Sequence, residues 1–191
     1  MHHRHFIIHK PYGYLSQFVS QATFEGKKKK LGELHDFPEG IMAIGRLDED
    51  SEGLLLLTTD GKMSEYIRSS HIEKEYYVQV DGLMSDEALA RMQGGVEIGV
   101  MDVRLQTGTC KAHRLDAPPA FAPRTRKIRD DRHGPTSWVS ITLTEGKFRQ
   151  VRKMTAAVGF PTLRLVRVRV GAMQLGGLIS GAVLEVSSFE G

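Results

Sequence analysis

The sequence contains a single cysteine, Cys110, and no apolar run that could cross a membrane. One cysteine excludes an intrachain disulfide and a zinc site built on a cysteine pair, which suits a reducing compartment. A transmembrane helix needs roughly 20 consecutive apolar residues, and the first residues lack the apolar segment and cleavage site of a signal peptide. We therefore expect a cytoplasmic protein that does not engage a membrane.

Motifs for common cofactors are absent as well. The chain has no Gly-x-Gly-x-x-Gly, Gly-Lys-Ser/Thr, His-Glu-x-x-His or Gly-x-Ser-x-Gly sequence, so dinucleotide, nucleoside triphosphate, zinc-protease and serine-hydrolase functions lack support. Metal binding is indicated only by His2, His3, His5 and His9, near the start of the chain. We expect these histidines to be structural or incidental, and we expect no metal and no organic cofactor.

The charge of the chain is unevenly distributed along its 191 residues. The net charge is only +3, yet residues 124–132 hold five basic residues, and residues 147–169 hold seven basic residues and no acidic one. Such segments indicate a surface for a polyanion, because each phosphate contact gains affinity by releasing counterions. A solvated charged surface is the alternative for either segment alone.

The hydrophobic pattern predicts more strands than helices. We expect strands over residues 4–9, 54–57, 73–80, 136–144, 163–170 and 182–187. We expect helices over residues 62–69, 85–93, with Ser85 as N-cap, and 148–158. Because these elements show no repeating strand–helix–strand order, the sequence predicts an α+β fold with a mostly antiparallel sheet. Residues 111–135 are expected to contain a long basic loop.

The most informative segment joins a polar turn to four leucines. It reads Gly45-Arg46-Leu47-Asp48-Glu49-Asp50-Ser51-Glu52-Gly53, followed by Leu54 to Leu57. The leucines predict a buried strand that fixes the preceding loop. Arg46 and Asp48 are two residues apart, so in extended backbone their side chains would point the same way. Taken alone, the segment is more typical of an acidic turn whose carboxylates accept hydrogen bonds from their own backbone.

Two later segments combine aromatic and basic residues. In Lys74-Glu75-Tyr76-Tyr77-Val78, the two tyrosines fall on opposite faces of the expected strand. In Glu145-Gly146-Lys147-Phe148-Arg149-Gln150-Val151-Arg152-Lys153-Met154, helical spacing places Arg149, Arg152 and Lys153 on one face, with Val151 and Met154 toward the core.

These three segments, in this order, resemble the motifs of RsuA-type pseudouridine synthases, which isomerise uridine in ribosomal RNA. Residues 135–138 and 159–165 further resemble the subfamily of large-subunit pseudouridine synthases E. The resemblance implies the pseudouridine synthase fold, a mixed and mostly antiparallel sheet with flanking helices and a catalytic cleft between two lobes. Many relatives carry an N-terminal S4 RNA-binding domain. We expect none here, and one catalytic domain over residues 1–191, because the first strand begins within ten residues of Met1.

The resemblance also implies a reaction and a role for each motif. A uridine of large-subunit (23S) ribosomal RNA would be flipped out, cleaved at its glycosidic bond and rejoined through C5. Asp48 matches the catalytic carboxylate and would act either as a nucleophile at C1′ or as a base at C2′. Tyr76 would stack on the base and help to remove the C5 proton, Arg152 would pair with Asp48 and keep it ionised, and Arg46 would insert near the vacated position.

Ribosomal RNA of the large subunit is therefore the expected partner of a monomeric enzyme without a nucleotide cofactor. The residues expected to bind RNA are Arg46, Lys74, Arg124, Arg126, Lys127, Arg129, Lys147 and Arg149. Two other functions stay open at this point. A non-catalytic RNA-binding or ribosome-assembly factor could use the same basic surface, and a glycosidase or nucleosidase could use two carboxylates from Asp48, Glu49, Asp50 and Glu52.

Overall fold

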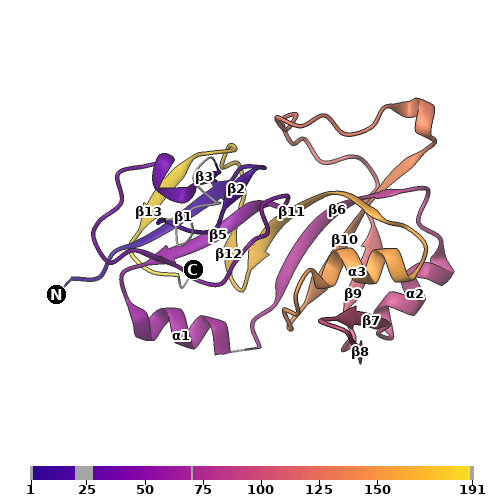
Figure 1. Cartoon of the computed structure of the whole chain (residues 1–191), viewed down its shortest axis with the longest axis horizontal. Coiled ribbons are helices and arrows are strands. Elements are labelled where there is room, and N and C mark those ends of the chain that lie inside the picture. The colour runs from indigo at the N-terminus through magenta and orange to yellow at the C-terminus, as the bar shows by residue number, and fades with distance from the viewer. Residues whose placement is uncertain (1, 20–27, 70, 190–191) are drawn as a thin grey trace. The chain divides into compact units, whose positions relative to one another are not determined.

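The computed structural model describes residues 2–19, 28–69 and 71–189, which form two compact units (Figure 1). The first unit comprises Met1–Ile72 and Arg167–Gly191, and the second comprises Glu73–Val166. Strand pairing is mostly antiparallel, and the described residues include three α-helices, so the predicted α+β class is confirmed. None of the helices in the described part of the chain is both long enough and apolar enough to span a membrane.

The first unit is a sheet built around two fully buried strands. The order of the strands is β13–β1–β5–β11, with β4 added to β5 and β12 to β11. The bounds are His5–Lys10 (β1), Met42–Ala43 (β4), Glu52–Thr58 (β5), Thr162–Val170 (β11), Met173–Gln174 (β12) and Val183–Val186 (β13). Every residue of β1 and β5 is buried, and Ile8 lies opposite Leu55 in their antiparallel register. The strand predicted from the leucines is therefore confirmed and is longer than expected.

Smaller elements complete the first unit. They are the parallel pair Tyr14–Leu15 (β2) and Lys29–Lys30 (β3), the short helix Leu31–Glu33 (η2) and the helix Gly61–Ser69 (α1). Asp60 caps α1, because its Oδ1 accepts from the backbone N–H groups of Lys62 (2.9 Å) and Met63 (3.2 Å). The α1 helix follows β5 directly, as the Asp-Gly turn predicted.

In the second unit, a sheet is covered on one face by two helices. The strand order is β11–β6–β10–β9, and a separate hairpin packs beside it. The bounds are Lys74–Asp81 (β6), Asp86–Gln93 (α2), Glu97–Val100 (β7), Val103–Gln106 (β8), Lys111–Arg114 (β9), Asp131–His133 (η3), Thr136–Leu143 (β10) and Gln150–Ala157 (α3). Val78 and Ile141 from the sheet form one buried cluster with Met92 of α2 and Met154 of α3. The Ser85 cap of α2 is confirmed, since its side chain accepts from Ala88 N–H.

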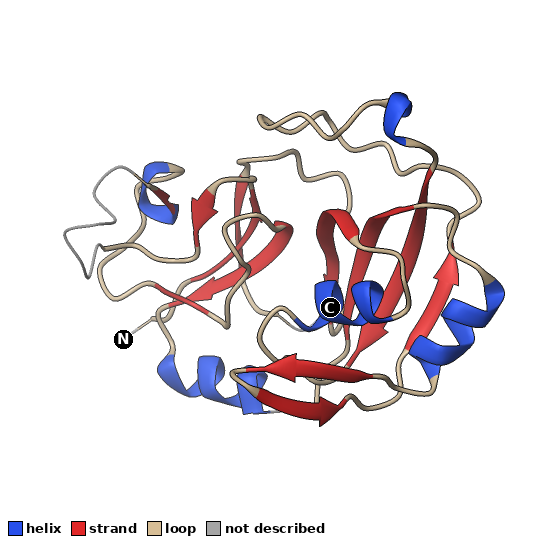
Figure 2. Ribbon diagram, turned by 45° about the vertical axis from the view of Figure 1, so that its right-hand side comes forward, coloured by secondary structure: helices blue, strands red, loops and turns tan. Residues whose placement is uncertain are grey.

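Two expected boundaries in the second unit are wrong. Lys111–Arg114 is a strand paired with β10, so the long loop begins at Leu115 rather than at residue 111. Apart from the short η3, residues 115–135 are loop (Figure 2). Helix α3 begins at Gln150 rather than at Phe148, because Arg149 adopts a left-handed conformation (φ 53°) that no α-helix contains.

Candidate active site

The loop with Arg46 and Asp48 lies in the first unit, immediately before β5. Arg46 is exposed, Leu47 is buried and Asp48 is half-buried, which is the alternation expected of extended backbone. Leu47 is held twice by Ser16, whose Oγ accepts from its N–H (3.0 Å) and donates to its carbonyl (2.6 Å). The N–H of Ser51 donates to the carbonyl of Asp48 (3.0 Å) and closes the loop. The loop is thus anchored through the buried Leu47, while Arg46 and Asp48 on either side of it stay more accessible.

A buried lysine ties this loop to the turn after β1. The ammonium of Lys10 donates to the carbonyls of Pro11 (3.0 Å), Tyr14 (2.7 Å) and Glu49 (3.4 Å). Burial lowers the pKa of Lys10 to about 8, although the acidic residues of the loop oppose this shift. These are Glu52, Asp50, Asp48 and Glu49. A positive charge therefore lies inside the unit, beside the carboxylates of the loop.

Gly53 permits close approach of two backbones at the start of β5. Its φ is +108°, and a Cβ at this position would overlap the carbonyl oxygen of Arg167 and come within 2.6 Å of its amide nitrogen. Arg167 is itself buried and donates from Nε to the carbonyl of Leu54 (2.8 Å). The expectation that residues 147–169 form one basic surface is therefore wrong in part, because Arg164 and Arg167 are both buried.

The second and third motifs meet in the second unit. Lys74 begins β6 opposite Leu143, and its Nζ donates to the carbonyl of Thr144 (3.4 Å). Tyr76 packs against the buried cluster that includes Val151 of α3, while Tyr77 contacts Phe121 on the opposite face (ring centroids 6.3 Å apart). The predicted division of the two tyrosines is confirmed, and Tyr76 lies on the same side of the sheet as the helix that carries Arg152.

Glu145 organises the turn between β10 and α3. It accepts hydrogen bonds from the backbone N–H of Gly108 (2.8 Å), from Gln150 Nε2 and from the ammonium of Lys147. Burial alone would raise the pKa of Glu145, but these hydrogen bonds outweigh it and hold the pKa below its usual range. Lys147, an expected RNA contact, is therefore part of an ion pair that shapes the turn.

The long basic loop is fixed at two points within the second unit. Phe121 contacts Tyr77 and Trp138, and Arg164 lies over its ring and donates to the carbonyl of Ala122 (2.9 Å). Further along, Arg129 forms an ion pair with Asp81 through both terminal guanidinium nitrogens, one of them at 3.0 Å.

Between these anchors, Arg126 and Lys127 are exposed, and Arg124 donates to the carbonyl of Arg126 (2.8 Å). Lys74 and Asp81 lie at opposite ends of β6. At 3.3 Å per residue, the ion pair of Arg129 with Asp81 is therefore about 23 Å from Lys74. Arg129 therefore serves as an anchor of the loop rather than as an exposed cation.

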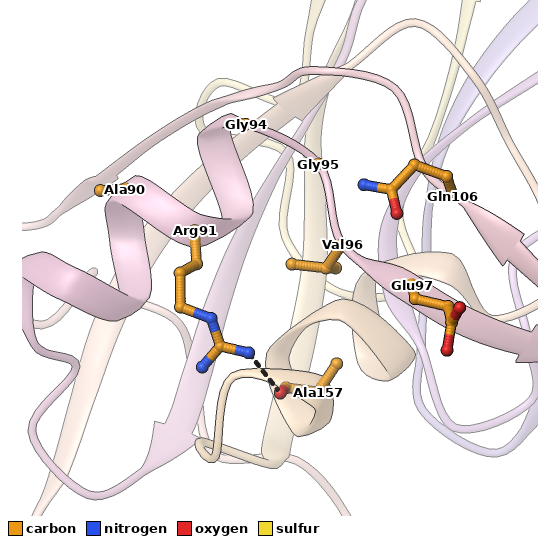
Figure 3. A pocket seen from close by; sticks show the side chains of 8 residues that line it. All are labelled: Ala90, Arg91, Gly94, Gly95, Val96, Glu97, Gln106 and Ala157. Carbon is orange, nitrogen blue, oxygen red and sulfur yellow. Dashed lines mark hydrogen bonds between the residues drawn. The ribbon is translucent and has the colours of Figure 1, made fainter.

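An open depression of about 480 Å³ lies elsewhere on the second unit (Figure 3). It is lined by the end of α2 and the start of β7, and Arg91 donates across it to the carbonyl of Ala157 (3.4 Å). None of the residues predicted from the motifs lines this depression. The candidate site is therefore formed by the motif residues and is separate from this depression.

Comparison with known proteins gives the class of this chain. The sequence model of the family described as RNA pseudouridylate synthase matches residues 4–157, and the chain belongs to this family. Ribosomal large subunit pseudouridine synthase E of Xanthomonas campestris pv. campestris is 41% identical over 92% of this chain and 91% of that protein. The protein of the same name from Vibrio parahaemolyticus is 40% identical over 94% of this chain and 72% of its own length.

A solved structure supports the same assignment. A crystal structure of a pseudouridylate synthase matches with a TM-score of 0.74 and 26% sequence identity, covering 96% of this chain and 70% of that one. The fold and the enzyme class that the motifs implied are confirmed.

Proposed function

We propose that this protein isomerises one uridine of large-subunit ribosomal RNA to pseudouridine, with Asp48 as the catalytic carboxylate. The support is membership of the family and the names of the relatives. The observation that carries the assignment of Asp48 is its place on a loop held by Ser16 and Lys10 at the start of a fully buried strand. A carboxylate held in this way is pre-positioned for chemistry at a bound sugar.

The reaction breaks the N1–C1′ bond, forms the C5–C1′ bond and exchanges the C5 proton for a proton at N1. Asp48 acts at the sugar, as nucleophile at C1′ or as base at C2′. Tyr76 stacks on the uracil and removes the C5 proton, for which a phenol supplies both a ring and an oxygen. Arg152 contributes its positive charge to the reaction of Asp48, and Arg46 enters the position that the flipped base leaves.

Exposed and half-buried cations bind the RNA. In this proposal Arg126 and Lys127 of the basic loop contact phosphates, Lys74 and Arg149 contact the RNA near the flipped base, and Arg124, Arg129 and Lys147 shape the surfaces from which the others act. The enzyme acts as a monomer in the cytoplasm and needs no nucleotide cofactor. Light scattering of the purified protein, alone and with RNA, tests the monomer.

The substitution Asp48→Asn tests the proposal because it removes the charge of the carboxylate and keeps its shape. Tritium release from ribosomal RNA labelled at C5 of uridine should fall below detection, while RNA affinity should change less than about twofold. Asp50→Asn is the matched control, since Asp50 lies in the same acidic loop and has no assigned step, and it should retain activity.

Three results would contradict the proposal. Normal tritium release by Asp48→Asn would remove Asp48 from the chemistry. Binding of ribosomal RNA by the wild-type protein without any release would favour an assembly factor, and free uracil among the products would favour a nucleosidase.

A further inference from the structure

Phe148 is an aromatic residue whose large side chain is exposed to solvent in the folded protein. Its exposed fraction is 62%, and it lies in the turn between β10 and α3. Burying such a ring would be favourable, so a ring that stays exposed on a fixed turn is available to a partner. Lys147 and Arg149 flank it in the sequence, and the ammonium of Lys153 lies 5.0 Å from the centre of the ring.

The backbone around Phe148 is fixed from both sides. Before it, Glu145 ties the turn to Gly108 and Gln150, and the N–H of Lys147 donates to Gln150 Oε1 (3.0 Å). After it, Arg149 holds a left-handed conformation, which is unfavourable for a non-glycine residue and persists where the surroundings fix it. The ring therefore projects from an ordered turn.

The position of this turn relates it to the proposed site. The turn follows the end of β10, where Lys74 bonds to Thr144, and leads into the helix of Arg152. Val151, three residues after Phe148, belongs to the cluster against which Tyr76 packs. Phe148 thus lies at the end of the second unit that carries Lys74 and Arg152, and not at the Asp81 end where the basic loop is anchored.

We propose that Phe148 is a stacking platform for an unpaired RNA base that neighbours the isomerised uridine. The base stacks on the ring face opposite Lys153, and Lys153 and Arg149 meet the adjoining phosphates. An aromatic ring set among cations is the combination with which proteins hold single-stranded nucleic acid, and stacking tolerates any base. Lys147, Arg149 and Lys153 outnumber the nearby acid Glu145, which is paired with Lys147. This excess of positive charge favours RNA over a protein partner. The inference rests on the proposed function for the identity of the RNA.

Binding measurements on catalytically inactive protein test this inference separately from the reaction. In an Asp48→Asn background, the affinity for a fluorescein-labelled ten-nucleotide oligouridylate is measured by anisotropy. Phe148→Leu, which keeps an apolar side chain but removes the ring, should bind about tenfold more weakly. Phe148→Tyr should bind within about twofold of the parent, because it keeps the ring. Tyr66→Leu, which removes an equally exposed aromatic from α1, should bind like the parent.

Stacking also requires a base. The difference between the parent and Phe148→Leu should disappear with an oligonucleotide of the same length that lacks bases. Equal affinity of Phe148→Leu and the parent for oligouridylate would overturn the inference, as would a change of oligomeric state in Phe148→Leu with RNA binding intact, which would make the ring a protein contact. Neither result depends on tritium release, so failure of the proposed reaction is detected independently.

Discussion

At the scale of single residues, Lys10 is the charge on which the conformation of the Asp48 loop depends. Its three carbonyl partners come from two segments that are far apart in the sequence, and one of them is Glu49 in the loop itself. An ammonium has three donors, and all three are used, so a neutral amine would have to give up one hydrogen bond. The residue is both a structural tie and a buried titratable group.

The pKa of Lys10 predicts a specific pH dependence of stability. A lysine in an unfolded chain has a pKa of about 10.4, whereas Lys10 in the folded protein has a pKa of about 8. Between these values the unfolded chain binds a proton that the folded protein has lost, so the free energy of unfolding rises with pH and this contribution is lost as pH falls through about 8. Relative to Lys10→Met, the wild type should gain about 1 kcal/mol per pH unit in this window.

Urea unfolding at pH 7.5, 8.5 and 9.5 measures this difference. Lys62→Met, at an exposed position on α1, is the control and should follow the wild type at all three values. Parallel pH profiles of the wild type and Lys10→Met would show that Lys10 does not titrate in this range.

At the scale of elements, the pairing of β5 with β11 depends on the missing side chain of Gly53. Gly53→Ala meets both an unfavourable φ and overlap with the backbone of Arg167, so it should lower the free energy of unfolding by about 3 kcal/mol or more. Gly61→Ala is the matched control, because its Cβ would meet nothing within 4 Å at the start of α1. We expect that control to be neutral or stabilising by up to about 1 kcal/mol. Equal melting temperatures for the two variants would contradict the account.

The basic loop is the second element whose role can be measured. With Arg129 paired to Asp81, the exposed Arg126 and Lys127 are the proposed phosphate contacts. The double variant Arg126→Gln, Lys127→Gln should weaken RNA binding and reduce the slope of log affinity against log salt by about 1.4, which is 0.7 for each contact to a single strand. Lys62→Gln with Arg68→Gln on α1 removes as much charge and should leave the slope unchanged. An unaltered slope in the loop variant would exclude the loop as a phosphate site.

At the scale of the whole molecule, the sequence predicted those features that contiguous stretches encode. The leucine run predicted β5, Ser85 predicted the start of α2, and the third motif predicted most of α3. The hairpin of β7 and β8 was not predicted, because Met101 and Asp102 form its turn with positive φ and without the usual Asn-Gly signal.

Contacts between residues that are far apart in the sequence could not be predicted from the sequence either. Arg167 was counted as a surface cation, yet it lies buried against Leu54, which is 113 residues away. The contact of Lys10 with Glu49 and the anchoring of Arg129 by Asp81 likewise join a strand to a loop that is far away in the sequence. An arginine or lysine can be buried when its N–H groups donate to backbone carbonyls or to a carboxylate. Residue type alone does not predict which of these residues are buried in this way.

The most direct test of the central claim is a map of pseudouridines in 23S ribosomal RNA from a strain that lacks this gene. We predict that one site is lost, that Asp50→Asn on a plasmid restores it, and that Asp48→Asn, expressed at the same level, does not. A complete set of pseudouridines in the deletion strain, or restoration of the lost site by Asp48→Asn, would contradict the account.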